Sequence, residues 1–293
     1  MDLVSILIPA YKPTYFKLAL TSAITQTWQN KEIIVSDDCP TNAIKEICDQ
    51  FGDLVIYQRN PYPDGKGATN HLNLLRNAKG DYCKFLCDDD LLLPLCVEKL
   101  LNGYKKHEKS NVNLIFSARN TIDSENNYLS TTDYFKHEGD VIISGLDMMR
   151  FMALNCCNVI GEPTTVLFRR DSIPHDINLW SIDELYFGII DLSIFMHLLP
   201  RGNVLKIPGV LSCFRDNNES TSLPVNNPEF DKLVTVWGNI IRFADRNKLF
   251  TPEQKIQAYA CYRKVIISQL PRAEHLLELF TQSVLSLKND LQI

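Results

Sequence analysis

Short apolar runs alternate with segments of helical spacing along the first half of the chain. The runs have few polar interruptions, which is typical of strands that a parallel sheet buries on both faces. They predict strands at residues 4–10, 32–36, 54–58, 82–86 and 113–117. Apolar residues three and four positions apart predict helices between them, at 15–25, 41–51, 70–78 and 97–106. This alternation predicts an α/β fold, Rossmann-like, with a mostly parallel central sheet flanked by helices.

The alternation ends near residue 120. Residues 120–139 are polar and predict a surface excursion. The elements that we expect beyond it are a short helix at 144–154, strands at 164–169, 203–207 and 211–215, and a helix in the second half of 183–199. Residues 216–228 are rich in Asn, Ser and Pro and predict a loop or linker, followed by a mainly helical pattern. We therefore predict a main domain at 1–222 and a small helical C-terminal extension at 223–293.

Composition and charge narrow the function classes. The chain has 293 residues, 45% of them hydrophobic, which is enough for a well-buried core. Its net charge of -5 gives no electrostatic case for nucleic acid as a partner. The nine cysteines form no even framework and no CxxC pair, which favours a reducing compartment. We expect no secretory leader and no membrane span, since no apolar run reaches about 20 residues.

Polar signatures follow three of the predicted strands, at the point where each strand ends. They are Pro9-Ala10-Tyr11, Asp37-Asp38 and Asp88-Asp89-Asp90. Ligands of open α/β sheets bind beyond the carboxyl ends of the strands. Three strand ends with ligand-type residues therefore predict one shared site.

The three consecutive aspartates are the strongest of these signatures. Each carboxylate disfavours ionisation of its neighbours, so the cluster is electrostatically costly. A hard cation would offset that cost, because Mg²⁺ or Mn²⁺ is held by one or two carboxylates and completed by substrate phosphates. The alternative is a solvated acidic turn that caps the helix beginning near Pro94.

These motifs, in this order, resemble the family 2 glycosyltransferases, which have the GT-A fold. Residues 4–11 are similar to the opening strand of that family, and residues 32–38 to its second segment with the paired aspartate. Residues 161–163 with 167–170 resemble the acceptor-side loop and strand. Asp191 matches the aspartate of the family's Glu-Asp motif. The resemblance covers roughly residues 4–222 and makes this the GT-A domain.

The resemblance implies that the chain transfers a sugar from a nucleoside diphosphate donor to a hydroxyl of a glycan or glycoconjugate. The reaction would depend on a metal and invert the anomeric configuration, and the expected donor is a UDP-sugar. Mn²⁺ or Mg²⁺ would offset the charge of the leaving diphosphate. Asp89 would hold this cation, with Asp90 assisting. Asp88 would flank the nucleotide sugar or assist the metal.

The resemblance also assigns the nucleotide side of the site. Asp38 would contact the base or the ribose, and Tyr11, just past Pro9 and Ala10, would stack on the base. The alternatives are an Asx cap at Asp37-Asp38 for the next helix and a half-buried aromatic at Tyr11. Lys66 would contact the diphosphate, with a solvated loop charge as the alternative.

On the acceptor side, Asp191 would be the general base that takes the proton of the acceptor hydroxyl. A carboxylate inside an apolar stretch is costly to bury, so we expect it to have a specific role. The alternative to a general base is a helix N-cap. Glu162 and Arg215 would bind acceptor or diphosphate, with structural ion pairs as the alternative.

The sequence departs from the family at two positions. Cys87 replaces the first acidic residue of the metal motif, and Ile190 replaces the Glu of the Glu-Asp motif. These departures keep open a catalytically inactive nucleotide-binding or scaffold subunit. A sugar-phosphate nucleotidyltransferase ranks lower, because residues 11–14 lack the Gly-rich, Arg-containing loop that it needs.

The expected partners are a nucleoside diphosphate sugar and a glycan or lipid-linked glycan, and not nucleic acid. Peripheral association with a membrane and a homo-oligomer stay open. The expected location is the cytoplasm, with the inner face of the membrane as the site of such association.

Overall fold

The computed structural model describes residues 2–63, 67–174, 177–179, 181–182, 184–186, 189–216, 230–269, 277–278, 281 and 285. The chain divides into two compact units. The first consists of Met1–Ile143, Ile160–Ile177 and Arg201–Asn217, and the second of Ser144–Val159, Asn178–Pro200 and Asn218–Ile293. The second unit thus combines the C-terminal helices with two segments from the middle of the chain. The predicted boundary between residues 222 and 223 lies outside the described residues and stays a prediction.

A large mixed sheet forms the first unit, and its strand order is β3-β2-β1-β4-β9-β6-β12-β5. The strands are β1 (Val4–Ala10), β2 (Lys31–Asp37), β3 (Ile56–Arg59), β4 (Tyr82–Phe85), β5 (Leu91–Leu92), β6 (Val112–Ile122), β7 (Tyr128–Thr132), β8 (Val141–Ser144), β9 (Val166–Arg169) and β12 (Asn203–Arg215). Strands β1 to β4 pair in parallel. Strand β9 is antiparallel to both neighbours, β4 and β6, so the sheet is mixed where the sequence predicted mostly parallel pairing. Antiparallel pairing thus begins in the part of the chain where strands and crossover helices no longer alternate.

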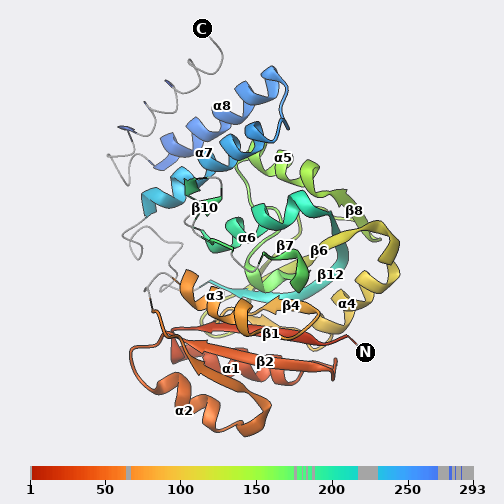
Figure 1. The fold of residues 1–293 in the computed structure, drawn as a ribbon, viewed down its shortest axis with the longest axis vertical. Helices are drawn as coiled ribbons and strands as arrows, with labels where there is room; N and C mark the ends of the chain where they lie inside the picture. Colours follow the sequence, from red (N-terminus) through yellow and green to blue (C-terminus); the bar gives the residue numbers. More distant parts are fainter. Residues whose placement is uncertain are drawn as a thin grey trace. The chain divides into compact units, whose positions relative to one another are not determined.

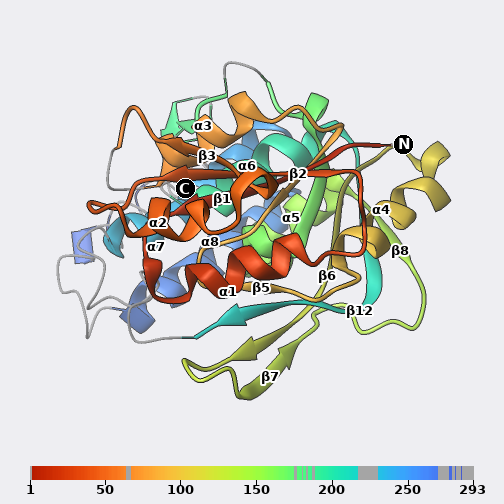
Figure 2. The same cartoon turned by 90° about the horizontal axis from the view of Figure 1, so that it is seen from below.

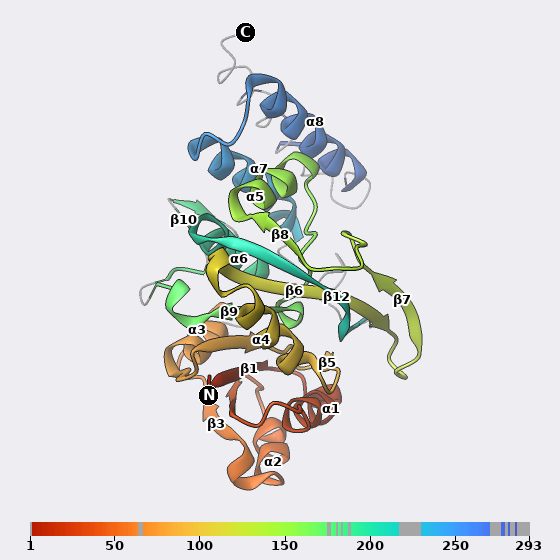
Figure 3. The ribbon, with the colours of Figure 1, turned by 90° about the vertical axis from the view of Figure 1, so that its right-hand side faces the viewer.

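Helices cover both faces of this sheet, as predicted (Figures 1 and 3). They are α1 (Pro13–Ile24), α2 (Ala43–Asp49), α3 (Ala68–Asn77) and α4 (Cys96–Lys106), with short 3-10 turns elsewhere. One face of β1 packs with apolar residues of α1, α2 and α4. Helix α3 packs on the opposite face against β1 and β2, where the rings of His71 and Phe85 lie 5.0 Å apart. Strand β1 is buried on both sides, which explains its continuous apolar run.

The later part of the sheet differs from the sequence prediction in two places. The polar segment 120–139 includes the end of β6 and the whole of β7, which pair as an antiparallel ribbon (Figure 2). Strand β12 is one strand of 13 residues, where two were predicted. Its pairing with β6 shifts register between Lys206 and Val210, around Gly209 with a φ of +91°. A glycine adopts this backbone conformation without strain, so the strand bulges and continues.

The second unit is mainly helical. Its helices are α5 (Gly145–Asn155), α6 (Ile190–Leu198), α7 (Phe230–Arg246) and α8 (Pro252–Gln269), and its two short strands, β10 (Ser181–Ile182) and β11 (Leu185–Tyr186), pair with each other. Helices α5, α7 and α8 pack against one another. Among the residues that the structure describes, no helix combines the length and the apolar character that a bilayer span requires.

Candidate functional site

The structure brings the three polar strand ends to one edge of the sheet. Ala10, the last residue of β1, is in register with Asp37, the last residue of β2. Strand β4 runs parallel to β1 on its other side, so the acidic turn at residues 88–90 follows at the same edge. This shared edge was the central prediction of the sequence.

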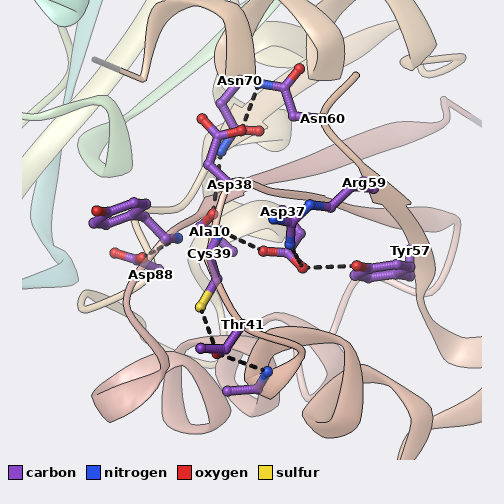
Figure 4. Close-up of polar contacts among 12 residues, drawn as sticks. Ala10, Asp37, Asp38, Cys39, Thr41, Tyr57, Arg59, Asn60, Asn70 and Asp88 are labelled. Carbon is purple, nitrogen blue, oxygen red and sulfur yellow. Dashed lines mark hydrogen bonds and ion pairs between the residues drawn. The ribbon is translucent and has the colours of Figure 1, made fainter. Parts of the chain in front are cut away.

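Asp37 and Asp38, at the end of β2, make different contacts (Figure 4). Asp37 is fully buried, and its Oδ1 accepts a hydrogen bond from the amide of Cys39 at 2.7 Å. Its Oδ2 accepts from the hydroxyl of Tyr57 at 2.8 Å and from Arg59 at 3.0 Å. Burial and the bond to Asp37 raise the pKa of Tyr57 to about 12. Asp37 is therefore the structural member of the pair and makes the Asx-type turn that was one of the two alternatives.

Asp38 lies in a small polar cluster beyond the ends of β1 and β2. Its Oδ1 accepts a hydrogen bond from Asn60 at 2.7 Å, and Asn60 also donates to Thr69. The carbonyl of Ala10 accepts from the amide of Asp38 at 2.8 Å and from the side chain of Asn70 at 3.3 Å. Figure 4 shows these side chains converging above Ala10. Among the residues that the structure describes, the buried Asn70 Oδ1 has no hydrogen-bond partner, so this part of the chain leaves an acceptor unused in the cluster.

Asp88 joins the loop after β1 to the acidic turn after β4. Its Oδ2 accepts hydrogen bonds from the backbone amides of Tyr11 and Lys12, each at 2.7 Å. Burial and the neighbouring Asp89 raise the pKa of Asp88 to about 6, against the effect of these two amides. Tyr11 itself is 51% exposed, so its ring is accessible for stacking.

Asp90 is 1% exposed, and both of its carboxylate oxygens have protein partners. Oδ2 accepts from the hydroxyl of Thr164 at 2.6 Å, and Oδ1 accepts from the amide of Arg215 at 3.0 Å. Burial and the charge of Asp89 raise the pKa of Asp90 well above its usual range. These contacts suit an anchor of the turn better than the metal ligand that was predicted at this position.

Asp89 lies between these two anchored residues and is half-buried. Within the described part of the chain, no group of three or more His, Cys, Asp or Glu residues is arranged to hold a metal ion. The donor set at this turn therefore fits a cation that takes one carboxylate from the protein and the rest of its ligands from water and substrate phosphates. Mg²⁺ and Mn²⁺ bind in this way. Cys87 suits such a cation poorly, because Mg²⁺ and Mn²⁺ prefer oxygen ligands to a soft thiol, and burial raises the pKa of this thiol well above its ordinary value.

Glu162 makes the structural ion pair that was one alternative for it. Its Oε2 lies 2.5 Å from Nε of Arg119 on β6, and both side chains are largely buried. Burial raises the pKa of Glu162, and Arg119 opposes the shift. Gly161, directly before it, has a φ of +110°, and a Cβ there would meet Thr165 and Arg119 at about 3 Å. The local backbone therefore requires glycine.

Arg215 is 1% exposed, and its guanidinium contacts backbone and side-chain groups of the same unit. Its Nε donates to the carbonyl of Asp89 at 2.8 Å and its Nη1 to the carbonyl of Asp123 at 2.7 Å. Its Nη2 donates to Asn126 at 2.8 Å, and the group stacks over the ring of Tyr15 at 4.2 Å. These contacts give Arg215 a structural task, and the predicted binding of acceptor or diphosphate stays a prediction.

Asp191 belongs to the second unit, as the second residue of α6. The helix is preceded by Ile189 at the N-cap position, without a side-chain cap, so the predicted alternative of an N-cap does not describe Asp191. Oδ2 of Asp191 accepts a hydrogen bond from Asn158 at 2.8 Å.

Several polar residues of the site were missed in the sequence. Asn158 follows no predicted strand. Asn60 comes two positions after the third predicted strand, and this position could have drawn attention to it. Thr164 adjoins the motif at 161–163, but its bond to Asp90 spans 74 positions. Lys66 lies outside the described residues, so its predicted contact with a diphosphate stays a prediction.

Comparison with known proteins gives consistent matches. A profile described as glycosyl transferase family 2 matches residues 5–173. An uncharacterized glycosyltransferase of Rickettsia typhi is 28% identical over 200 residues, which are 63% of this chain and 61% of that protein. One of Rickettsia bellii is 32% identical over 279 residues, 93% of this chain and 38% of that protein. The chain thus spans less than two thirds of the length of these relatives.

A named relative and a solved structure extend these matches. The UDP-Glc:alpha-D-GlcNAc-diphosphoundecaprenol beta-1,3-glucosyltransferase WfaP of Escherichia coli is 27% identical over 245 residues, 72% of this chain and 88% of that protein. Residues 1–349 of TarS of S. aureus, solved in complex with UDP-GlcNAc, align with a TM-score of 0.60 at 12% identity, covering all of this chain and 92% of that one. This structural likeness shows a common fold. With the profile matching more than half of its residues, the chain belongs to glycosyltransferase family 2.

Proposed function

We propose that this chain transfers a sugar from a UDP-sugar to a hydroxyl of a glycan or lipid-linked glycan, with inversion at the anomeric carbon and with the help of Mn²⁺ or Mg²⁺. The names of two similar proteins support a UDP-sugar as the donor. WfaP is named as a UDP-glucose enzyme that acts on a diphosphoundecaprenol-linked sugar, and TarS was solved with UDP-GlcNAc.

One observation of this structure carries the proposal. The carboxylate of Asp88 holds the amides of Tyr11 and Lys12, so the exposed ring of Tyr11 and the turn with Asp89 belong to one polar edge. A nucleoside diphosphate has an aromatic base at one end and a charged diphosphate at the other. An edge that offers a stacking ring and a carboxylate turn matches both ends of such a ligand.

Asp38 and its cluster would read the base or the ribose. The bond from Asn60 occupies Oδ1 of Asp38 and fixes the orientation of the carboxylate. Uracil presents an N–H donor on its pairing edge, and a ribose presents hydroxyl donors, so a fixed carboxylate suits either. A buried acceptor of this kind rejects a ligand that lacks the matching donor, because the acceptor would then stay unpaired.

Asp89 is the residue that we assign to the cation. When bound, a divalent ion acts as a Lewis acid and offsets negative charge on the leaving diphosphate. Asp88 and Asp90, which are held by their own hydrogen bonds, keep the turn in place, so that Asp89 supplies the protein ligand.

Asp191 is the residue that we assign as general base. It would accept the proton of the acceptor hydroxyl as that oxygen forms a bond to the anomeric carbon and the bond from this carbon to the UDP oxygen breaks. A single displacement of this kind inverts the anomeric configuration. The hydrogen bond from Asn158 to Oδ2 orients the carboxylate of Asp191 for this proton transfer.

The test is a panel of UDP-, GDP- and dTDP-sugars with Mn²⁺, assayed with glycan and lipid-linked acceptors and followed by mass spectrometry. We expect turnover of UDP-sugars, and NMR of the product should show the anomeric configuration opposite to that of the donor. Retention would contradict the assignment of one general base. Cys87 and Ile190, the two departures from the family, favour a second candidate, a nucleotide-binding subunit without activity. Binding of UDP with Mn²⁺ but no turnover or donor hydrolysis across the panel would establish that second candidate.

A further inference from the structure

We propose that Arg215 is a positioning residue that fixes the Asp89 turn for cation binding. This inference rests on the proposed function of Asp89. It assigns to Arg215 a task inside the first unit, in place of the contact with an acceptor that the sequence suggested.

The first step is that Arg215 joins three segments that are far apart in the sequence. Its guanidinium donates to the backbone of the acidic turn at Asp89, and to Asp123 and Asn126 in the turn between β6 and β7. Its planar face rests on Tyr15 of α1 at 4.2 Å. A rigid, planar fork of donors meets acceptors in three different directions, a spread that the compact ammonium group of a lysine does not span.

The second step is that the same turn is held from its other side. Asp90 accepts hydrogen bonds from the amide of Arg215 and from the hydroxyl of Thr164. Thr164 also accepts from the amide of Cys87, and its carbonyl accepts from the fully buried Lys84. Asp88 ties the start of the turn to β1. The backbone on both sides of Asp89 is thus fixed before any ligand binds.

The third step is what this arrangement does for a cation. When the protein supplies a single carboxylate to a cation, the affinity for the cation depends strongly on how well that carboxylate is positioned. The bond from Nε of Arg215 to the carbonyl of Asp89 holds the peptide that carries this side chain. Loss of this hydrogen bond would weaken the binding of the cation and leave the nucleotide contacts that we assign to Asp38 intact.

The experiment measures two affinities in each variant: UDP without metal, and Mn²⁺ in the presence of saturating UDP, by isothermal titration and by the EPR signal of free Mn²⁺. Arg215→Lys keeps the buried charge but loses the fork, and we expect about tenfold weaker Mn²⁺ binding, since one charge-assisted hydrogen bond corresponds to at least that factor. Metal-free UDP affinity should stay within about twofold. Hydrogen exchange should become faster at the amides of residues 88–92.

A second variant covers the case in which Arg215→Lys does not fold. Asn126 is exposed and has a φ of +71°, so Asn126→Gly keeps the backbone conformation and removes only the acceptor of Nη2. We expect a smaller loss of Mn²⁺ affinity, about threefold. The matched control is Arg170→Lys, because Nε of Arg170 also donates to a backbone carbonyl, that of Gly80, at the opposite end of β4. It should leave both affinities unchanged.

Wild-type Mn²⁺ affinity in Arg215→Lys overturns the inference, and if that variant does not fold, wild-type affinity in Asn126→Gly overturns it. Asp89→Ala separates this result from the proposed function. If Asp89→Ala abolishes Mn²⁺ binding while the Arg215 and Asn126 variants bind normally, only the positioning role fails. If Asp89→Ala binds Mn²⁺ as the wild type does, the metal assignment itself fails.

Discussion

Asn158 donates a hydrogen bond of 2.8 Å to the carboxylate of Asp191. Both residues belong to the second unit, and the bond joins the segment after α5 to the first turn of α6. A carboxylate that is fixed through one oxygen presents the other in a defined direction. This is the arrangement that a general base requires, since proton transfer depends on geometry before pKa.

Asp191→Asn should therefore abolish most of the transfer activity and leave donor binding unchanged. A positioned base contributes about 10²–10⁴-fold to the rate, and the amide has a similar shape but accepts no proton. The measurement is kcat with a saturating donor, together with the Kd of UDP. A rate within a factor of three of the wild type would place the base elsewhere.

Asn158→Ala should lower kcat by about tenfold and leave the KM of the donor unchanged, because Asp191 stays present but loses the group that orients it. Asn155→Ala is a suitable control. Asn155 lies three positions earlier and is exposed, and its side chain donates to the carbonyl of Phe151 within its own helix. Equal losses in both variants would mean that the segment as a whole, and not the bond to Asp191, had been disturbed.

Asp89→Ala should abolish the metal dependence of nucleotide binding. We expect the affinity for UDP to become the same with and without Mn²⁺, because the protein ligand of the cation is removed. Asp171→Ala provides the control, since this aspartate is exposed and lies near the far end of β9. An unchanged stimulation by Mn²⁺ in Asp89→Ala would contradict the assignment.

Substitutions of the two aspartates at the end of β2 should affect different properties, UDP binding for Asp38 and folding stability for Asp37. Asp38→Ala should weaken UDP binding by about tenfold or more, because it removes the acceptor that we assign to the base or ribose, and it should lower Tm less than Asp37→Ala, because Asn60 keeps Thr69 as an acceptor. Asp37→Ala should instead lower the free energy of unfolding by about 2 kcal/mol, since it leaves the half-buried Tyr57 hydroxyl and the buried Cys39 amide without their acceptor. Titration calorimetry and chemical denaturation measure the two effects. The reverse pattern would exchange the roles of the two residues.

Asp140 should make a pH-dependent contribution to stability. Its Oδ2 accepts from Lys106 at 2.7 Å and from His107 at 2.8 Å. Burial raises the pKa of Asp140, but these two hydrogen bonds outweigh it, so the pKa lies below its ordinary value. The unfolded chain therefore takes up the proton first as the pH falls. The stabilisation is present above about pH 4, the unfolded pKa, and is lost as the pH drops through the folded pKa.

Asp140→Asn should accordingly lower the free energy of unfolding by about 0.5–1 kcal/mol at pH 5 and by less at pH 3, a small effect because Lys106 is exposed. Urea denaturation at the two pH values measures it. A difference between variant and wild type that grows on acidification would contradict the expected direction.

The sequence predicted what depends on local pattern. Strand β1 was predicted at its observed bounds, and β2 within one residue at each end, because burial on both faces leaves a continuous apolar run. The placement of Asp38 and the acidic turn at one edge of the sheet also followed, since parallel strands bring their carboxyl ends together. In β12 the prediction failed, because a Pro-Gly pair reads as a break when a bulge allows the strand to continue.

Long-range polar contacts could not be predicted in the same way. Asp90 meets Thr164 and Arg215 at separations of 74 and 125 positions, and no periodicity links such residues. The pattern of three aspartates could show that charge was concentrated there. It could not show that two of them are occupied by the fold, which leaves Asp89 as the candidate for the cation.

The double hydrogen bond of Asp88 has a thermodynamic consequence. A ligand that stacks on Tyr11 steadies the loop after β1, and through Asp88 it also steadies the neighbouring peptide of Asp89. In the proposed site, base and cation therefore share one coupling free energy, and reciprocity requires that each raises the affinity of the other by the same factor. The proposed site would fill cooperatively, so that empty protein and protein with both ligands would be favoured over forms that hold the nucleotide or the cation alone.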